Sequence, residues 1–463
     1  MTKAVFTADE LATATGGVWN ITPPAGSCWS INTDSRTIRS GECFLPIIGE
    51  KFDGHTFLDK LPPGVIALSQ NNYPLPEGLP VLLVKDTILA YQNIARFHRL
   101  RMPRLQLVAV TGSVGKTSVK EMLRAIFTAA VGEQSVLYTI GNTNNQIGVP
   151  QNLLRLTPDI AYAVIEMGTN HHGEIAPLSA AALPNAAIVN TIAACHLEHL
   201  GDLEGVAREK SAIYSSLLPD GCAIYPVDCA GQKLLASAAD KFHAMTFGES
   251  SNKDSDVSAE YLSGSLNGSE VRLNFRTSGC SITFAWGLTG RHQAVNAAAA
   301  AAAASALNIP PEVIAQGLAN TVLPGQRMNA LEHNGCLWIN DAYNANPQSM
   351  KSSLNSIAEN ILPDRQLLLV LGDMLELGEQ EIFYHQEILE FVRQRFADCQ
   401  YRLLLLGKRF ARAAEQLDQT AENWQFFDNI DQLENHIRYL RKPGMTIFLK
   451  SSNSIGLSKV EPC

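Results

Sequence analysis

The sequence predicts an α/β protein of three domains, in which a mostly parallel central sheet is followed by a second, doubly wound sheet. Two observations favour this fold class. The chain has 463 residues, 46% of them hydrophobic, which is enough for about two to four domains with buried cores. From about position 105, short continuous apolar runs alternate with helical stretches, which is typical of parallel strands covered on both faces.

The first 104 residues have a mixed texture. Apolar pieces at Cys43–Ile48 and Val65–Leu68 predict strands, and turn-rich sequence separates such pieces. A helix is expected over Ile88–Arg99. The basic, proline-bearing segment Arg99–Leu105 is interpreted as a linker, so that residues 1–104 form the first domain.

The second domain is expected over 105–323. Its predicted parallel strands are Leu107–Val110, Ala163–Gly168 and Ala186–Asn190. A helix is predicted over Ser118–Ala130, and polar–apolar alternation from about 250 to 286 predicts antiparallel strands. The run Ala297–Ala304 predicts a tightly packed helix, because alanine is the best helix former and its small side chain allows close packing.

A further set of apolar runs, with helical stretches between them, predicts a third domain over 324–463. The expected strands are Leu337–Asp341, Leu367–Asp373, Leu403–Gly407 and Thr446–Lys450. This is a second doubly wound α/β pattern.

Composition excludes several classes of partner. The formal net charge is -9, so the chain lacks the basic surface with which proteins bind nucleic acid or anionic membranes. No apolar run of about 18 residues or signal-like start is present, and none of the nine cysteines forms a C-x-x-C pair. We therefore expect a cytoplasmic monomer with free thiols, small-molecule substrates, and no nucleic-acid or membrane partner.

A glycine-rich turn, TGSVGKTS, directly follows the first strand of the second domain and opens a helix. Its expected phosphate-binding residues are Gly112, Ser113, Val114, Gly115, Lys116, Thr117 and Ser118. Inward-turned N–H groups and the helix N-terminus would hold a phosphate, Lys116 would neutralise the β- and γ-phosphates, and Thr117 would bind Mg²⁺. The alternative is an ordinary glycine turn, since the spacing G-x-x-G-K-T is shorter than the usual motif.

Three polar residues after the loop are candidates for the same chemistry. Glu166 ends a buried strand of the parallel sheet, where a metal-bound nucleotide would lie; the alternative is a carboxylate that caps a helix. Taken alone, His196 is more typical of a structural histidine, and Lys210 resembles a solvated lysine on an amphipathic helix.

The phosphate loop and several later motifs resemble those of the Mur ligase family. The matching stretches are TDSR (33–36), GEKFDGHTF (49–57), GNTNNQIGVPQNLL (141–154), EMGTNHHGEI (166–175), GQRMN (325–329), NDAYNANPQSM (340–350) and VLGDMLELGEQE (370–381). They cover nearly the whole chain in the expected order. The resemblance implies an N-terminal UDP-binding domain, a central phosphate-loop ATPase and a C-terminal Rossmann-like domain.

The resemblance also implies an activity. Within the family, the motifs are most similar to those of members that join D-alanyl-D-alanine to UDP-N-acetylmuramoyl-tripeptide, with ATP and Mg²⁺, through an acyl phosphate. Thr117, Glu166 and His196 would hold magnesium ions together with Lys210, which would carry a carbamate. A carbamate requires a neutral amine, so the surroundings of Lys210 should lower its pKa.

Further contacts follow from the resemblance. Residues expected near ATP, besides the phosphate loop, are Asn296, Arg327 and Asp341. Residues expected near the UDP moiety are Ser35, Arg36, Asp53, Gly54 and His55, and those near the peptide end are Asn144 and Asn145. Residues expected to line the C-terminal side of the cleft are Tyr343, Asn344 and Asn346, for which a helix-start turn is the alternative.

The chain departs from the family pattern at several positions. Asn340 replaces the first residue of an Asp-Asp pair, and Lys450-Ser451-Ser452-Asn453 replaces Lys-Gly-Ser-Arg. Ser211-Ala212 replaces Gly-Glu after the lysine, Pro226 replaces an asparagine, and Cys195 replaces an alanine. The phosphate loop and the three polar residues that follow it are unchanged.

Two other functions remain open from the sequence. One is a related ligase with another substrate, such as a different Mur-type amino-acid ligase or a folylpolyglutamate synthase. The other is a nucleotide-operated switch or binding module without ligase chemistry, which would hydrolyse nucleotide slowly and ignore peptide substrates.

Overall fold

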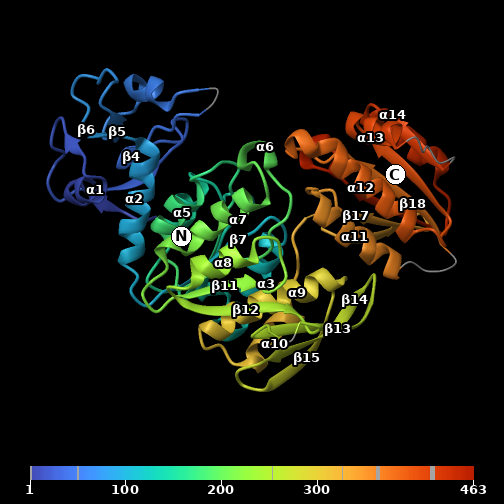
Figure 1. Cartoon of the computed structure of the whole chain (residues 1–463). Helices are drawn as coiled ribbons and strands as arrows, with labels where there is room; N and C mark the ends of the chain where they lie inside the picture. The colour runs from blue at the N-terminus through green and yellow to red at the C-terminus, as the bar shows by residue number, and fades with distance from the viewer. Residues whose placement is uncertain are drawn as a thin grey trace.

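The computed structural model describes residues 3–49, 52–252, 254–325, 327–360, 365–417 and 423–462. Motif positions 50, 51 and 326 lie outside these residues. Within them, no helix combines the length and the apolar character that crossing a lipid bilayer requires. The elements gather around three sheets, and Figure 1 shows the blue N-terminal unit and the orange-red C-terminal unit on either side of the green and yellow central unit.

The N-terminal unit contains a six-stranded sheet in the order β1-β3-β4-β5-β6-β2, parallel in its middle and antiparallel at both ends. Its strands are β1 (Phe6–Thr7), β2 (Val18–Trp19), β3 (Cys28–Asn32), β4 (Glu42–Phe44), β5 (Ile66–Gln70) and β6 (Val81–Val84). Its helices are α1 (Ala8–Thr15), the 3-10 helix η1 (Gly54–Lys60) and α2 (Thr87–Leu100). The strand expected over Cys43–Ile48 ends earlier, at Phe44, since Pro46 has no N–H to donate to a ladder.

The central unit contains a nine-stranded sheet in the order β15-β14-β13-β12-β11-β10-β7-β9-β8. Its strands are β7 (Gln106–Thr111), β8 (Val136–Tyr138), β9 (Tyr162–Glu166), β10 (Ala186–Val189), β11 (Cys222–Pro226), β12 (His243–Glu249), β13 (Val257–Ser265), β14 (Gly268–Phe275) and β15 (Cys280–Trp286). In this sheet order, all neighbouring strands between β13 and β8 pair parallel, whereas β14 pairs antiparallel with both β13 and β15. The antiparallel strands predicted for that stretch are therefore confirmed.

Helices cover both faces of this sheet. They are α3 (Lys116–Val131), α4 (Gly148–Leu153), α5 (Ile175–Ala182), α6 (Leu197–Leu200), α7 (Leu203–Ser211), α8 (Gln232–Ala239), α9 (Arg291–Ala306) and α10 (Pro311–Ala319), with short 3-10 helices η2 (Glu133–Ser135) and η3 (Ala212–Ser216). Along β7, Leu107 and Ala109 join one apolar cluster and Val108 and Val110 the other. The strand is continuously apolar because successive side chains enter opposite, equally covered faces.

The alanine run forms the buried core of α9. Every side chain from Ala297 to Ala304 is fully buried. The helix packs against α3 and against the strands β12 and β13, and small side chains permit this close approach on all sides. The predicted tightly packed helix is therefore confirmed.

The C-terminal unit contains a six-stranded sheet in the order β16-β17-β21-β18-β19-β20, parallel except for the β16–β17 pair. Its strands are β16 (Asn329–His333), β17 (Cys336–Asn340), β18 (Gln366–Gly372), β19 (Tyr401–Leu406), β20 (Trp424–Phe427) and β21 (Met445–Lys450). Its helices are α11 (Pro347–Asn360), α12 (Glu381–Arg395), α13 (Lys408–Gln416) and α14 (Ile430–Leu440), with 3-10 helices η4 (Gly378–Gln380), η5 (Asn453–Ile455) and η6 (Leu457–Lys459). All four predicted strands are present, and the mixed α/β fold class is confirmed.

The topology brings the candidate residues to sheet edges. The glycine turn lies at the carboxyl end of β7, Glu166 is the last residue of the neighbouring strand β9, and Asn190 directly follows β10. Ligands of open α/β sheets bind outside this edge. The chain passes from the first sheet to the second after α2, and from the second to the third between α10 and β16. The domain boundaries proposed at 104/105 and 323/324 stay predictions.

Candidate active site

The glycine turn forms a cradle at the N-terminus of α3. Gly115 occupies the N-cap with φ +81°, and no side chain caps the helix, so its first N–H groups face the cradle. A Cβ at Gly115 would lie 2.2 Å from Nδ2 of Asn190 and 2.5 Å from Oδ1 of Asn296, so only glycine fits. The Lys116 ammonium donates to the Gly112 carbonyl at 2.7 Å and therefore stays above its own loop.

Side chains that carry oxygen atoms meet beside the cradle. Glu166 is 3% exposed; its Oε2 accepts from the Thr117 hydroxyl at 3.0 Å and its Oε1 accepts from the Asn144 amide at 3.0 Å. Arg327 of the C-terminal unit donates to the same Thr117 hydroxyl at 3.2 Å. The helix-capping alternative for Glu166 does not hold, because its carboxylate binds side chains at the phosphate loop.

Lys210 lies on α7 and is buried, with 1% of its surface exposed. Burial lowers the pKa of Lys210 to about 8; the positive charge of Lys116 acts in the same direction, whereas Cys195 and Glu209 oppose it. The helix pattern alone suggested a solvated lysine, and that interpretation was wrong, because the polar side of α7 at this position is covered by neighbouring elements. A substantial fraction of the amine is neutral near pH 8, as carbamate formation requires.

His196 precedes α6 in a left-handed conformation, with φ +52°. Its side chain is 21% exposed, and its Nδ1 lies 2.6 Å from Oε2 of Glu376 in the C-terminal unit. That approach lies off the line of an ideal hydrogen bond. Burial lowers the pKa of His196, and Glu376 opposes the shift.

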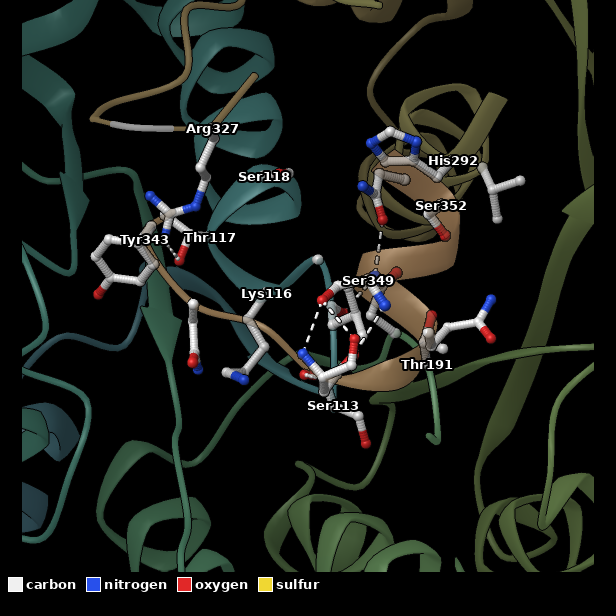
Figure 2. A pocket seen from close by; sticks show the side chains of 18 of the residues that line it. Ser113, Lys116, Thr117, Ser118, Thr191, His292, Arg327, Tyr343, Ser349 and Ser352 are labelled. Atoms are coloured by element: carbon white, nitrogen blue, oxygen red, sulfur yellow. Dashed lines mark hydrogen bonds between the residues drawn. The ribbon is translucent and has the colours of Figure 1, made fainter. Parts of the chain in front are cut away.

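The C-terminal unit closes over the phosphate loop through several side chains. The Arg327 guanidinium lies 3.9 Å from the centre of the Tyr343 ring, and Figure 2 shows it pointing towards Thr117 beside that ring. The Asn346 amide donates to the Ser113 carbonyl at 3.5 Å. The contacts of Arg327 with Thr117 and of Asn346 with Ser113 join segments more than 200 residues apart in the chain.

The helix-start alternative for the asparagines holds locally as well. The Asn346 side chain accepts from the Ser349 N–H at 2.8 Å and so caps α11. The Asn344 side chain accepts from the N–H of Ala345 within the same turn. Asn346 therefore both caps its helix and reaches across the cleft.

One cavity of about 980 Å³ unites these groups. The predicted residues that line it are Ser113, Val114, Gly115, Lys116, Thr117, Ser118, Asn144, Asn145, Glu166, His196, Asn296, Arg327, Asp341, Tyr343, Asn344 and Asn346. Gly112 and Lys210 do not line it: the Gly112 carbonyl accepts from Lys116, and Lys210 is buried. The cavity is large enough for a nucleotide together with part of a second ligand.

Two family models match the central and C-terminal units. Residues 110–304 match the model of the Mur ligase middle domain, and residues 326–453 match the Mur ligase glutamate ligase domain. The UDP-N-acetylmuramoyl-tripeptide--D-alanyl-D-alanine ligase of Escherichia coli (strain K12) is 36% identical over 93% of this chain and 92% of its own length. This chain belongs to the Mur ligase family. A Bacillus subtilis (strain 168) ligase of the same name is also 36% identical, with the same coverage.

A solved structure shares the whole architecture. The crystal structure of MurF from Acinetobacter baumannii has a TM-score of 0.89 and 30% sequence identity, covering 99% of this chain and 98% of that one. The three-sheet arrangement of this Mur ligase is therefore shared with that structure over nearly all of both chains.

Five predicted residues lie away from the cavity, in the N-terminal unit. They are Ser35, Arg36, Asp53, Gly54 and His55. Arg36 is exposed and pairs with Asp34 at 2.8 Å, and this pairing holds the pKa of the Asp34 carboxyl at about 2. Asp53 caps η1, accepts from Tyr73 and binds the buried His55, whose ring stacks on Tyr73 at 3.8 Å. The side chains of Asp53 and His55 thus stabilise their own turn.

The sequence interpretation missed three residues of the site. Asn190 is buried directly after β10, and its amide donates to the Val114 carbonyl at 3.0 Å and to Asn296 Oδ1 at 2.8 Å. Lys450 ends β21 and lines the cavity, and Glu376 reaches His196. A polar residue at the carboxyl end of a parallel strand is a recognisable signal, so the first two could have been found.

The buried ion pair between Asp341 and Lys450 is expected to stabilise the C-terminal unit against unfolding. The Lys450 ammonium lies 2.5 Å from Asp341 Oδ2, and both residues are more than nine-tenths buried. Asp341→Asn should lower the free energy of unfolding by about 3 kcal/mol, because it leaves a buried ammonium without its counter-charge. Urea unfolding followed through the buried Trp338 measures the change.

The matched control removes both charges. Asp341→Asn combined with Lys450→Met should be more stable than the single variant, since no buried charge remains unpaired. An unchanged urea midpoint in Asp341→Asn would show that the pair is not energetically coupled to folding.

Proposed function

We propose that this Mur ligase joins D-alanyl-D-alanine to UDP-N-acetylmuramoyl-tripeptide in an ATP-dependent reaction, giving the UDP-muramoyl pentapeptide of peptidoglycan synthesis. One observation carries the proposal: a single cavity joins the phosphate loop and its oxygen donors to side chains of the C-terminal unit. Its relatives named for this reaction match over 93% of the chain. We place the reaction in the cytoplasm and expect a monomer; the eight described cysteines are free thiols, which suits a reducing compartment.

ATP would lie across the carboxyl edge of the central sheet. The uncapped N-terminus of α3 and the N–H groups of the glycine turn would bind the phosphates, and Lys116 would turn from the Gly112 carbonyl to the β- and γ-phosphates. Asn296 would lie near the adenine. Arg327 and Asp341 would approach the phosphates and the ribose from the C-terminal unit.

The donor set fits Mg²⁺. The Thr117 hydroxyl and the Glu166 carboxylate lie 3.0 Å apart, and both are the hard oxygen ligands that this ion prefers. Among the described residues, no three His, Cys, Asp or Glu side chains converge as a metal cluster. Sparse protein ligation is expected of Mg²⁺, which keeps several waters and shares phosphate oxygens. When bound, the ion would supply positive charge to the phosphoryl group in transfer.

Lys210 is proposed to act as a carbamate. Its buried amine, with a pKa of about 8, could add CO₂ at neutral to mildly basic pH, with loss of one proton. The product is an anion that, with His196, would complete the second metal site. The neighbouring Lys116 supplies a positive charge that favours this anion.

The reaction requires an activated acid, because oxide is a poor leaving group at neutral pH. An oxygen of the tripeptide carboxylate would attack the γ-phosphorus, and the bond to ADP would break. The dipeptide amine would then attack the acyl carbon; phosphate would leave and the amine would lose one proton. Lys116 and Arg327 would reduce the repulsion between the two anions, and closure of the C-terminal unit would exclude water.

The remaining contacts are assigned from the resemblance to the family, and their positions suit a long substrate. The residues proposed near UDP lie in the N-terminal unit, outside the cavity, as the far end of a long substrate would require. Asn144 and Asn145 would face its peptide end, and Tyr343, Asn344 and Asn346 the C-terminal side of the cleft. In this assignment residues 1–104 would bind the UDP-sugar and residues 105–323 would bind ATP. Residues 324–463 would close over the cleft.

Mass detection of the pentapeptide product tests the proposal. Full-length protein would be incubated with ATP, Mg²⁺, UDP-muramoyl tripeptide and D-alanyl-D-alanine, with each component omitted in turn. The expected product requires all four and is accompanied by ADP and phosphate. No nucleotide consumption when both peptides are present would overturn the proposal.

Substitution of the amine separates the alternatives. A different Mur-type ligase or a folylpolyglutamate synthase would release phosphate with L-glutamate or a diamino acid in place of the dipeptide. A nucleotide switch would hydrolyse ATP slowly at a rate that neither peptide changes.

A further inference from the structure

The loop 373–378 of the C-terminal unit docks on the start of α6 in the central unit. It belongs to the VLGDMLELGEQE motif, which the proposed chemistry leaves without a role. A Cβ added to Gly378 would lie 3.3 Å from the Glu198 backbone nitrogen, so glycine permits a close approach. Figure 1 shows α6 at the side of the central unit that faces the C-terminal unit.

This docking loop is hydrogen-bonded to several parts of the C-terminal unit. The buried Asp373 carboxylate accepts the N–H groups of Arg409 and Phe410 at 3.1 Å and so holds the loop to α13. The Leu375 N–H donates to the Ser452 hydroxyl at 3.0 Å, and the Met374 N–H donates to a ring nitrogen of the buried His385 at 3.0 Å. These hydrogen bonds therefore anchor the loop to the C-terminal unit.

Glu376 projects from the docking loop onto His196. Oε2 of Glu376 lies 2.6 Å from Nδ1 of His196. Both residues have left-handed backbones, with φ +63° for Glu376 and +52° for His196. Non-glycine residues in this region are strained and persist where the surrounding structure imposes them, most often at functional sites.

We propose that Glu376 is a positioning residue for the metal ligand His196, supplied by the C-terminal unit only when that unit docks. This rests on the proposed metal site. A histidine that ligates a metal usually donates its other ring N–H to a carboxylate, which fixes the tautomer and the ring orientation. A proton on Nδ1 would leave Nε2 as the nitrogen for the ion, and the 2.6 Å approach, although off the line of an ideal hydrogen bond here, places the Glu376 carboxylate beside Nδ1. Here the carboxylate and the histidine belong to different units of the fold.

The consequence is a link between docking and metal binding. A docked C-terminal unit orients His196 and tightens the ion, and by thermodynamic reciprocity the bound ion favours docking. The second metal would then be held firmly only when the unit that excludes water is already in place.

Metal affinity measures the proposal without any peptide substrate. Mn²⁺ binding to the full-length protein with saturating ADP would be followed by electron paramagnetic resonance in wild type and in Glu376→Gln. We expect affinity at the weaker site to fall about 10- to 100-fold, the usual effect of losing such a carboxylate. Small-angle scattering should show that Mn²⁺ compacts wild type more than the variant.

A double-variant cycle with His196→Ala separates positioning from a merely structural contact. If Glu376 acts through His196, Glu376→Gln has no further effect on Mn²⁺ affinity in the His196→Ala background. Glu379→Gln, an exposed carboxylate three residues along, is the matched control and should bind Mn²⁺ as wild type does. Affinity within twofold of wild type in Glu376→Gln, or an equal loss in both backgrounds, overturns the proposal.

The Mn²⁺ experiment and the pentapeptide assay can fail separately. If the pentapeptide assay fails but Glu376→Gln weakens Mn²⁺ through His196, the positioning role stands and the substrate assignment falls. If ligation succeeds and the cycle shows no coupling, only the positioning role falls.

Discussion

Lys116→Ala is expected to lower the rate of ADP formation by at least about 10²- to 10³-fold, the cost of removing one preorganised donor at a site of charge transfer. Lys116 is the ammonium that stands over the phosphate loop, 2.7 Å from the Gly112 carbonyl. Without it, the anionic carboxylate would approach an unshielded γ-phosphate. A coupled assay of ADP release, with both peptides present, gives the measurement.

The control for this variant is another lysine of the central unit. Lys233 is exposed on α8 and lies outside the cavity, so Lys233→Ala should keep the wild-type rate. Thermal unfolding of Lys116→Ala should match wild type, because among the described residues the ammonium bonds only to its own loop. Retained turnover in Lys116→Ala would refute the role assigned to the loop.

Lys210→Ala is expected to lower ligation by about 10²-fold or more, because a bound ion supplies several kcal/mol of charge stabilisation and the variant removes one of its ligands. Formate or acetate should partly restore the rate by placing a carboxylate where the carbamate stood. Lys210→Arg keeps a positive charge but cannot form a carbamate, so it should be inactive and should not respond to these acids. Full activity in unrescued Lys210→Ala would contradict the carbamate.

Stability against pH, measured on protein freed of CO₂ so that the amine is unmodified, gives a second check on the burial of Lys210. Its pKa in the folded protein, about 8, is below the value of 10.5 for an unperturbed lysine. Between these two values the unfolded chain binds more protons than the folded chain. The free energy of unfolding of wild type, relative to Lys210→Met, should therefore rise as pH increases from 8 to 10.5. A flat difference across this window would mean that the amine is not buried as described.

Local chemistry made the phosphate loop and the sheet edges predictable. The turn around Gly115 requires a left-handed backbone and close approach, which glycine alone provides, and such a requirement is visible in the sequence. Continuous apolar runs predicted parallel strands because both faces of those strands are covered. Glu166 was placed correctly by topology, since the carboxyl end of a parallel strand faces the ligand edge.

Packing between distant segments decided the rest. The helix pattern around Lys210 resembles a solvated face, yet the fold buries that face and lowers the pKa of the amine. No local pattern connects Glu376 with His196, which are 180 positions apart and meet only through docking of two sheets. The glycine turn and the strands could be predicted from the amino-acid order, because they depend on near neighbours. Burial, charge environment and pairing between units depend on which distant surfaces meet, so they became visible only in the folded chain.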